Sequence, residues 1–461
     1  MSAYLATDAP VTDTPRPNVI WFFGDQHRAQ ATGYSGDPNL HTPSLDRLAA
    51  TGLEVTQAVG GCPLCCPFRG SLLSGRYPHE AVPGHEVPLP EGMPTVAGPF
   101  NEAGYRTAYL GKWHLDGGGR REGRQKGRLA LGTVTSERRG GFEHWLGFEN
   151  NESQYETWLH GHDETGEPVD HFRLPGYGTD AITDLAIDYI GRRGTVGGDG
   201  DPFFLAVSVQ SPHDPYIAPR QWMGRHTPGG VTLRPNVPDI PRVVRQARTE
   251  LAGYYAMIEN LDHNLGRLRD ALDQAGLADH THLVFFSDHG DMHGSHGMFR
   301  KTNPYEESLR VPCVIGGCRD RYDGRPSQLD APLNHVDYAP TSLGLCGIEP
   351  PEWMAGFNYA PFRLNDKPFP EPPDSAFCQL VKATGHRDST DRPWRAVVTR
   401  DGWKYACLER QPWLLFDLNE DPCEQANLAH NKRFAAERRR LNDRLAQWIA
   451  DTGDDFALPT L

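Results

Sequence analysis

Five short apolar runs along the chain are bounded by glycine or polar residues. They are NVIWFFG (18–24), TAYLG (107–111), FFLAVSVQ (203–210), HLVFFSD (282–288) and VPCVIGG (311–317). Continuous apolar runs of this length are typical of strands that are buried on both faces of a parallel sheet. The pattern therefore predicts a central sheet of parallel strands.

Segments with helical periodicity lie between these runs. Residues 42–52 begin with Thr42 as a candidate N-cap and Pro43 in the first turn, and they end at Gly52. Residues 179–192 and 247–277 repeat apolar side chains at helical spacing. Strands that alternate with helices predict an α/β fold with a large, mostly parallel sheet sandwiched by helices.

The C-terminal part of the chain has a different pattern. Pro-rich sequence over 349–374 reads as a linker, and AVVTRDGWKYACL (396–408) predicts a hairpin with an Asp-Gly turn. WLLFDL (413–418) adds a third strand, and 432–452 predicts a last amphipathic helix. We therefore expect a large α/β domain over residues 1–365 and a small α+β subdomain over residues 366–461.

Composition narrows the class of protein. The 461 residues are 38% hydrophobic, which is enough for a substantial core, and the net charge of -14 argues against nucleic-acid binding. The N-terminal sequence has no basic stretch followed by an apolar core, and NVIWFF is too short to span a membrane. Nine cysteines without framework spacing favour mostly free thiols in a reducing cytoplasm, although a trimmed signal would leave the same pattern.

Residues 115–180 are polar and Gly-rich and contain the basic stretch GRREGRQKGR (119–128). We interpret this segment as a solvated insertion loop, because charge runs usually face solvent. The alternative is a lid that attracts an anionic substrate.

Ionisable or metal-binding side chains follow four of the predicted strands. Asp25-Gln26 come after the first run, Lys112 and His114 after the second, His213 after the third, and Asp288-His289 after the fourth. Ligands of α/β sheets collect beyond the carboxyl ends of the strands. The four strand ends together predict one functional site.

Three cysteines lie within five positions: Cys62, Cys65 and Cys66. A structural zinc site would use Cys62 and Cys65 as half of its ligands, but no second half follows at a suitable spacing. A redox dithiol of the thioredoxin type lies at the start of a helix, and the C-P-L-C spacing of Cys62 and Cys65 permits this interpretation. A third interpretation starts from the residues that follow Cys65.

Cys65-Cys66-Pro67-Phe68-Arg69 fits the pattern C-x-P-x-R, and GSLLSGR (70–76) follows it. With RPNVIWFFGDQHR, GKWHL, SPHDPY, SDHGDMHGSHGMFRKTNPYEESLRVP and WLLFDLNEDPCEQANLA, the sequence resembles the type I sulfatases of the alkaline phosphatase superfamily over nearly its whole length. The resemblance implies an alkaline phosphatase-like fold. It also implies that a maturation enzyme oxidises the first cysteine of the motif to Cα-formylglycine. Only Cys65 has Pro at +2 and Arg at +4, so we expect Cys62 and Cys66 to be packing thiols.

The same resemblance implies one divalent metal. Its ligands would be Asp25, Gln26, Asp288 and His289, with the side chain of residue 65 completing the site. A mostly oxygen ligand set favours Ca²⁺. The family usually has a second Asp at position 26 and often Asn at 289, so Mn²⁺, Mg²⁺ and Zn²⁺ remain alternatives.

The resemblance also implies the catalytic roles. The hydrated aldehyde of residue 65 would be the nucleophile, activated by the metal. Arg69 would hold the diol, Lys112 would bind the sulfate or the diol, and His114 would take the proton that regenerates the aldehyde. His213 and Lys301 would contact the sulfate and protonate the leaving oxygen. Further candidates near these segments are His27, Arg28, His293 and His296.

The sequence therefore predicts a sulfatase that hydrolyses an O-sulfate ester, with a small-molecule or glycan sulfate as substrate and a sugar sulfate favoured. One alternative is a phosphonate monoester hydrolase or phosphodiesterase of the same superfamily, whose members carry Asp-Gln and Asp-His pairs. A second alternative is a non-catalytic anion-binding or redox protein with an unmodified Cys65. The oligomeric state, including a homo-oligomer, is left open.

Overall fold

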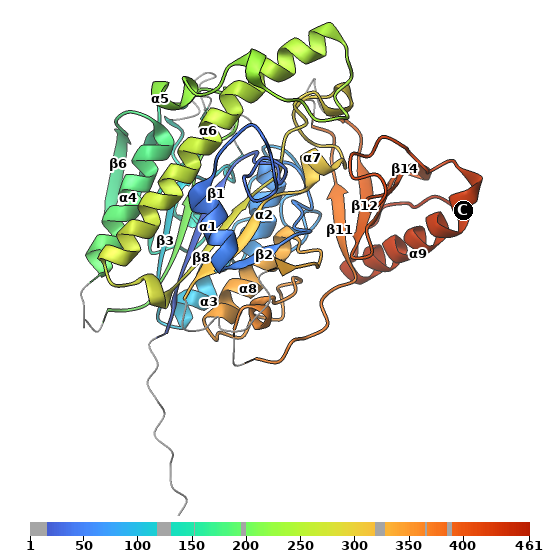
Figure 1. Ribbon diagram of the computed structural model, residues 1–461. Coiled ribbons are helices and arrows are strands. Elements are labelled where there is room, and N and C mark those ends of the chain that lie inside the picture. The colour runs from blue at the N-terminus through green and yellow to red at the C-terminus, as the bar shows by residue number, and fades with distance from the viewer. Residues whose placement is uncertain are drawn as a thin grey trace, which may run out of the picture.

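A computed structural model describes residues 16–117, 131–151, 153–194, 200–318, 328–364, 367–384 and 390–461. A large sheet with helices on both faces forms most of the molecule, and a smaller sheet with one helix lies beside it (Figure 1). The two predicted parts of the chain are thus visible. The boundary between residues 365 and 366 stays a prediction, because both lie outside the described residues.

The large sheet has ten strands in the order β10-β2-β9-β8-β1-β7-β3-β4-β5-β6. Its parallel centre consists of β8 (Thr281–Ser287), β1 (Asn18–Gly24), β7 (Phe203–Ser208), β3 (Arg106–Lys112) and β4 (His144–Phe148). Outside it lie β9 (Cys313–Gly317), β2 (Leu53–Val55), β10 (Gln328–Leu329), β5 (Trp158–His162) and β6 (Pro168–Arg173). Four of the five predicted strands belong to the parallel centre.

The fifth predicted strand, β9, is antiparallel to β8, so the expectation of a parallel strand at 311–317 was wrong. Hydrogen bonds from Gly290 N to the Ser308 carbonyl (2.9 Å) and from Met292 N to the Arg300 carbonyl (2.8 Å) fold the connection back on itself. The chain therefore stays at the carboxyl edge of β8 and re-enters the sheet from there. A parallel return would need a crossover to the opposite edge.

The expectation of a solvated loop over 115–180 was also wrong. The segment contains β4, whose five residues are all buried, and the hairpin of β5 and β6, which extend the large sheet. The basic stretch 119–128 lies outside the described residues. In the Pro-rich segment predicted as a linker, Tyr359 and Phe362 are buried in the core.

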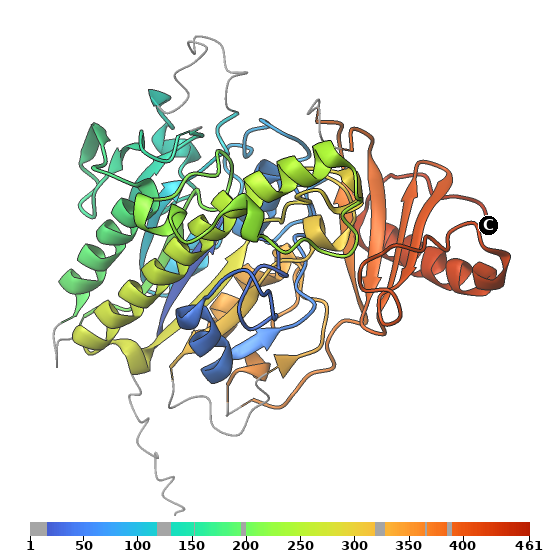
Figure 2. The ribbon, with the colours of Figure 1, turned by 45° about the horizontal axis from the view of Figure 1, so that its top comes forward.

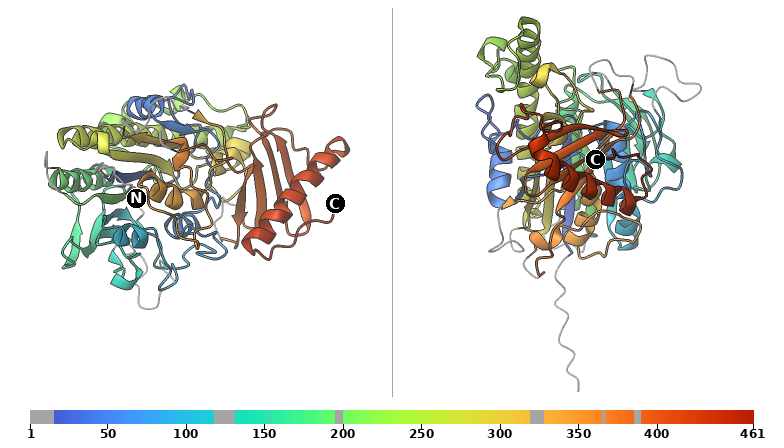
Figure 3. Two further views of the ribbon diagram at one scale, coloured as in Figure 1. Left: turned by 90° about the horizontal axis from the view of Figure 1, so that it is seen from below. Right: turned by 90° about the vertical axis from the view of Figure 1, so that its right-hand side faces the viewer.

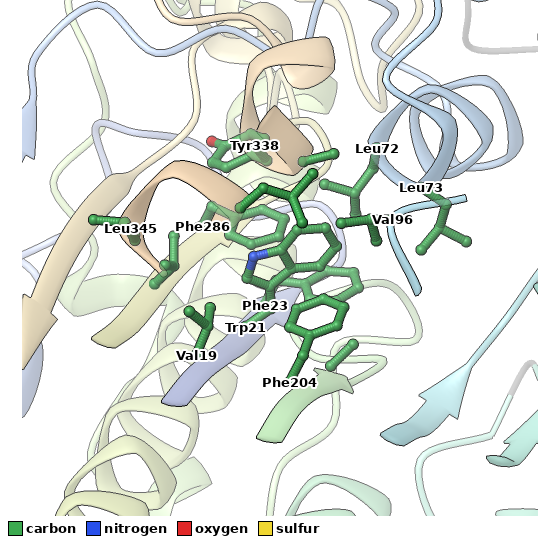
Figure 4. Packing of buried hydrophobic residues seen from close by; sticks show 14 of the residues in the cluster. Val19, Trp21, Phe23, Leu72, Leu73, Val96, Phe204, Phe286, Tyr338 and Leu345 are labelled. Atoms are coloured by element: carbon green, nitrogen blue, oxygen red, sulfur yellow. The ribbon is translucent and has the colours of Figure 1, made fainter. Parts of the chain in front are cut away.

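Alternate residues of β1 face the two layers of helices. Val19, Trp21 and Phe23 pack toward α2 (Cys65–Ser74), α3 (Ala97–Glu102) and α8 (Tyr338–Leu345). Figure 4 shows Trp21 and Phe23 among Phe204, Phe286 and Tyr338 on this side. Burial on both faces explains why the strand is apolar at every position from Val19 to Phe23.

Ile20 and Phe22 pack on the opposite side, toward α1 (Pro43–Thr51), α4 (Gly178–Arg193) and α6 (Pro241–Gln274). Figure 2 shows α6 running across this face, and the short α5 (Arg220–Met223) packs on it. Thr42 does not cap α1 with its side chain. Instead the carboxylate of Asp262, from α6, accepts hydrogen bonds from the amides of Ser44 (3.2 Å) and Leu45 (2.7 Å).

The smaller sheet is antiparallel, in the order β11 (Ser375–Leu380), β12 (Trp394–Thr399), β13 (Trp403–Leu408) and β14 (Gln411–Asp417). The predicted hairpin, third strand and last helix, α9 (Ala435–Thr452), are confirmed, whereas β11 was not foreseen. Figure 3 shows α9 along the outer face of this sheet. The inner face packs against Val59, Cys62 and Leu64 of the large domain.

The smaller sheet also binds the large domain through polar contacts. Gln379 N donates to the Gly61 carbonyl (2.7 Å), and the Trp394 indole donates to the Thr302 carbonyl (2.8 Å). Buried Lys404 on β13 pairs with Glu306 of α7 (Glu306–Leu309) at 2.6 Å and with Glu424 at 2.8 Å. These contacts fix two loops, at 59–64 and 300–303, that border the carboxyl edge of the large sheet.

Eight of the nine cysteines are buried, and Cys423 is half-buried. In the part of the chain that the structure describes, every helix is too short or too polar to cross a bilayer.

Replacing Lys404 with methionine should cost about 3–5 kcal/mol of the free energy of unfolding, because two buried carboxylates lose their cation. Chemical denaturation with urea would measure the change. The matched control is Arg440→Ala, whose partners Asp401 and Glu437 are exposed or half-buried, and whose loss should cost at most about 1 kcal/mol. An equal decrease in the free energy of unfolding for the two variants would contradict this account of the interface.

Candidate active site

The carboxyl ends of β1, β3 and β8 meet the start of α2 at one place. Asp25 follows β1, Lys112 ends β3, Asp288 follows β8, and Cys65 is the first residue of α2. One ligand atom each from Asp25, Cys65, Asp288 and His289 lies within 4.8 Å of the others, and all four residues are buried. Cys65 Sγ is 3.6 Å from Asp25 Oδ1 and 3.2 Å from His289 Nε2. The predicted strand ends thus do form one site.

Two buried cations, Lys112 and Arg69, lie beside the carboxylates of Asp25 and Asp288. Lys112 Nζ is 2.7 Å from Asp25 Oδ2, and Arg69 Nη2 is 3.1 Å from the same oxygen and 3.7 Å from Asp288 Oδ2. Arg69 Nη1 donates to the Lys112 carbonyl (2.7 Å) and to Ser208 Oγ (2.8 Å). These hydrogen bonds hold Asp25 and the end of β3, and the expected contact of Arg69 with the diol of residue 65 stays a prediction.

The acids differ in their ionisation. Burial alone would raise the pKa of Asp25, but Lys112, His213, Arg69 and Lys301 outweigh it and hold this pKa well below its usual value. Burial, and then the neighbouring Asp25, raises the pKa of Asp288. The ion pair of Asp288 with Arg69 is longer, at 3.7 Å, than the ion pairs of Asp25 with Lys112 and Arg69, at 2.7 Å and 3.1 Å.

A second group lies on the open side of Cys65. Lys301 Nζ is 3.7 Å from Cys65 Sγ, 3.0 Å from His213 Nε2 and 2.6 Å from Gln26 Oε1. The side chain of His213 is 20% exposed, which makes it the accessible edge of the group. His213 Nδ1 donates to the Asp214 carbonyl (2.7 Å), which leaves Nε2 facing Lys301.

The Gln26 amide is held in one orientation. Its Nε2 donates to Asp291 Oδ2 (2.7 Å) and to Tyr216 Oη (3.1 Å), so its Oε1 faces Lys301. Asp291 also accepts from Tyr216 Oη (2.6 Å) and from the amides of His293 and Arg300 (3.0 Å each). Asp291 and Tyr216 were missed in the sequence. The acid three residues after Asp288 was the available signal.

The imidazole of His289 is held in its neutral form, the form that binds a metal ion. Burial lowers its pKa, and its Nδ1 donates to the Gly290 carbonyl (3.0 Å). That hydrogen bond leaves the lone pair of Nε2 pointing at Cys65 and the two carboxylates.

The three clustered thiols have different surroundings. Burial and Asp25 would raise the pKa of Cys65, but Lys301, Lys112 and a hydrogen bond to His213 lower it to about 7. Burial raises the pKa of Cys62 and of Cys66. Cys62 lies in the apolar interface with the smaller sheet, as expected of a packing thiol.

The side chain of His114 lies away from the group around Cys65, beside His85. Strand β3 ends at Lys112, and the φ angle of His114 is +57°, so the two side chains diverge. His114 lies beside His85, with ring centroids 5.6 Å apart, and neither of its buried ring nitrogens has a hydrogen-bond partner within the described residues. Burial lowers its pKa well below the usual value.

The backbone carries unusual conformations around the site. Gln26, Arg300 and Thr302 have positive φ angles, as His114 does. This conformation costs energy in residues other than glycine. Gly111, with φ at +108°, lies so close to β7 that a Cβ there would be 2.0 Å from the Ser208 carbonyl oxygen. Glycine is therefore required where β3 delivers Lys112.

The four further candidates from the sequence lie outside the group of side chains around Cys65. His27 Nε2 contacts the Ala31 carbonyl (2.8 Å), and Arg28 donates to Tyr255 (3.2 Å). The His293 ring packs on Tyr254, and His296 stacks on Tyr305. His27, Arg28 and His293 are buried in these contacts, whereas His296 is half-buried.

The four-residue group fits a divalent cation. Its donors are two carboxylates, a neutral imidazole and the side chain of residue 65, and Asp288 Oδ2 is buried without a hydrogen-bond partner among the described residues. A bound cation would satisfy that oxygen and offset the like charges.

Two family models match the chain, and a curated protein is similar to it over most of its length. A family model described as Sulfatase matches residues 17–348, and one described as N-sulphoglucosamine sulphohydrolase, C-terminal, matches residues 294–451. The chain is 34% identical over 451 residues to the ulvan-active sulfatase of Formosa agariphila, covering 96% of this chain and 82% of that protein.

Two solved structures show the same fold. One is a Bacteroides thetaiotaomicron protein from that organism's metabolism of multiple glycosaminoglycans, 26% identical, with a TM-score of 0.82 and coverage of 95% of this chain and 97% of that one. The other is the phosphonate monoester hydrolase of Agrobacterium radiobacter, 22% identical, with a TM-score of 0.75 and coverage of 95% and 96%.

Adding Ca²⁺ to the purified chain should raise its unfolding temperature. When the free Ca²⁺ concentration is one hundred times its dissociation constant, binding adds about 2.7 kcal/mol to the free energy of unfolding. Asp288→Asn should remove the rise, because it takes away one anionic ligand. Calorimetry with and without the cation would measure it.

Asp262→Asn is the matched control, since Asp262 is also buried but lies at the start of α1. This variant should keep the cation-dependent rise even if it lowers the unfolding temperature itself. An undiminished rise in Asp288→Asn would show that the cation binds elsewhere.

Proposed function

The chain belongs to the sulfatase family, and from this premise we propose that it hydrolyses the O-sulfate ester of a sugar or another small organic sulfate. The observation that carries the proposal is the place of Cys65. It is the first residue of a buried helix, and it faces two carboxylates, a neutral imidazole and Lys301. These are the surroundings that a nucleophile beside a metal requires.

We propose that a maturation enzyme converts Cys65 to Cα-formylglycine. Members of the family generally use this residue together with a divalent metal, and Asp25, Asp288 and His289, whose ligand atoms lie together, would hold the metal here. Gln26, the residue after Asp25, would complete the set if its Oε1 turned from Lys301 to the metal. Oxygen donors from three of these four side chains favour Ca²⁺. When present, the cation and the hydrated aldehyde would supply charge neutralisation and the attacking hydroxyl.

The remaining side chains have roles that follow from their contacts. Lys112 and Arg69 hold Asp25 in its ionised, fixed position. Lys301 and His213, 3.0 Å apart at the accessible edge, would bind sulfate oxygens and transfer a proton to the leaving oxygen. His114 is neutral, as a base must be, and we propose that it accepts the proton released when residue 65 is regenerated.

A sugar sulfate is the favoured substrate class. The C-terminal family model takes its name from an N-sulphoglucosamine sulphohydrolase, and the relatives include an ulvan-active sulfatase and a protein of glycosaminoglycan metabolism.

A phosphonate monoester is the second candidate substrate. The fold matches the phosphonate monoester hydrolase with a TM-score of 0.75, and the pairs Asp25-Gln26 and Asp288-His289 resemble those of such enzymes. Both substrates present an anionic ester to the same cations, so the site's charge does not separate them.

Replacing Cys65 with alanine should reduce sulfate-ester hydrolysis by at least about a thousandfold, because the nucleophile is lost. Cys62→Ala is the matched control. It should keep the turnover rate and cost about 1–3 kcal/mol of stability through lost packing. Equal losses of activity would contradict the assignment of residue 65.

Mass spectrometry of the peptide that contains residues 62–69 should show an aldehyde at position 65 in protein from its own organism. A free thiol there, together with absent hydrolysis, would instead support a non-catalytic anion-binding or redox protein. With the pKa of Cys65 at about 7, such a thiol would be partly ionised at neutral pH.

Rates on an aryl sulfate and on an aryl phosphonate monoester, measured with the same preparation, should favour the sulfate. A clear preference for the phosphonate would replace the first candidate substrate with the second, while both results would leave the role of Cys65 intact.

A further inference from the structure

Next to the proposed active site lies a second group of metal-ligating side chains. The ligand atoms of Cys66, His85 and His114 all lie within 4.8 Å of one another. Cys66 Sγ is 3.9 Å from His85 Nδ1, and the rings of His85 and His114 meet edge to face at 5.6 Å between centroids. We propose that this Cys66 group is a binding site for a thiophilic divalent cation such as Zn²⁺.

The spacing suits such an ion. With bonds of about 2.3 Å to sulfur and about 2.1 Å to nitrogen, a tetrahedral Zn²⁺ brings sulfur and nitrogen to about 3.6 Å and two nitrogens to about 3.4 Å. The observed 3.9 Å between Cys66 Sγ and His85 Nδ1 needs only a small rotation of the imidazole.

His114 supplies the independent observation that points to a ligand. Its side chain is only 3% exposed, and both ring nitrogens are buried without a hydrogen-bond partner in the described part of the chain. Unsatisfied polar atoms of this kind are rare inside proteins, because their lost hydration is not replaced. A cation between His114, His85 and Cys66 would satisfy one of the two nitrogens.

A third group of metal-ligating side chains differs from the Cys66 group in its charges. In the group of His296, Glu307 and Glu424, the acids already have cations: Arg234 pairs with Glu307 at 2.8 Å, and Lys404 pairs with Glu424 at 2.8 Å. The Cys66 group combines one thiol with two imidazoles and contains no carboxylate. Nitrogen and sulfur donors select Zn²⁺ over Ca²⁺.

A cation can reach the site from solvent. The His85 side chain is 18% exposed, and the adjacent Glu86 side chain is 22% exposed. The amide of Glu86 also donates to Cys66 Sγ (3.4 Å), which turns the sulfur toward His85. On binding, Cys66 would exchange its thiol proton for the metal and release that proton to solvent.

The position of His114 gives this site a consequence for turnover, which rests on the proposed function. If His114 accepts a proton during the reaction, a cation bound to it prevents that step. Zn²⁺ bound at the Cys66 group should therefore inhibit hydrolysis without displacing Ca²⁺ from the neighbouring acids.

The binding test uses Co²⁺ as a spectroscopic probe for Zn²⁺, added to the full chain with Ca²⁺ in excess. A thiolate-to-cobalt charge-transfer band should appear, persist in Cys65→Ala and in Cys313→Ala, and vanish in Cys66→Ala. A band that is lost in Cys65→Ala and retained in Cys66→Ala would place the cobalt at the acidic group and overturn the proposal. So would a chain that gives no band.

His85→Gln keeps the test decisive if Cys66→Ala fails to fold, because His85 is partly exposed. This variant should weaken Co²⁺ and Zn²⁺ binding at least about tenfold. An unchanged affinity would exclude His85 as a ligand and overturn the proposed site.

Activity provides a separate readout. Without Zn²⁺, His85→Gln should turn over like the unmodified sequence, and it should need at least about ten times more Zn²⁺ for half inhibition. Equal inhibition of both proteins would overturn the inhibitory consequence. Absent hydrolysis in both would count against the proposed function, while the cobalt band would still decide the site.

Discussion

The structure depends on how two fully buried carboxylates, Asp25 and Asp288, are kept ionised and close together. Burying a charge is costly unless a partner is fixed beside it, and here the partners come from distant segments: Arg69 from α2, Lys112 from β3 and Lys301 from the loop between β8 and β9. None of these segments can hold its charge in the interior alone. The fold and the site are therefore formed by the same interactions, and Asp288 Oδ2, buried without a hydrogen-bond partner among the described residues, is the atom at which a divalent cation would bind.

The smaller sheet takes part in this constraint although it contributes none of the catalytic residues we propose. Its backbone binds the loop before Cys65 through Gln379, and its Trp394 binds the carbonyl of Thr302, next to Lys301. Lys404 anchors the same sheet to α7. Cys65 and Lys301, far apart in the sequence, are thus held at a fixed separation by a unit that packs behind both. Positive φ angles at Arg300 and Thr302 show that this fixation overcomes local backbone preference.

One step along α2 changes the chemistry completely. Successive residues of a helix point about 100° apart, so Cys65 and Cys66 face different groups although they are neighbours. Cys65 meets carboxylates, an imidazole and a lysine, whereas Cys66 meets two imidazoles. Oxygen-rich surroundings favour a hard cation and sulfur-nitrogen surroundings favour a softer one. The two adjacent thiols therefore give the chain two chemically distinct positions within one turn of helix.

The sequence by itself determined four of the five central strands and the hairpin with its Asp-Gly turn. Apolar run length and turn residues are local properties, and local patterns report burial and periodicity directly. Only the tertiary structure decided the reversed direction of β9, the strands within 115–180, the bonding of Arg69 to Asp25 and the turn of His114 toward His85. These features depend on which distant groups meet, and on φ angles that packing imposes, and neither is encoded in the spacing of neighbouring residues.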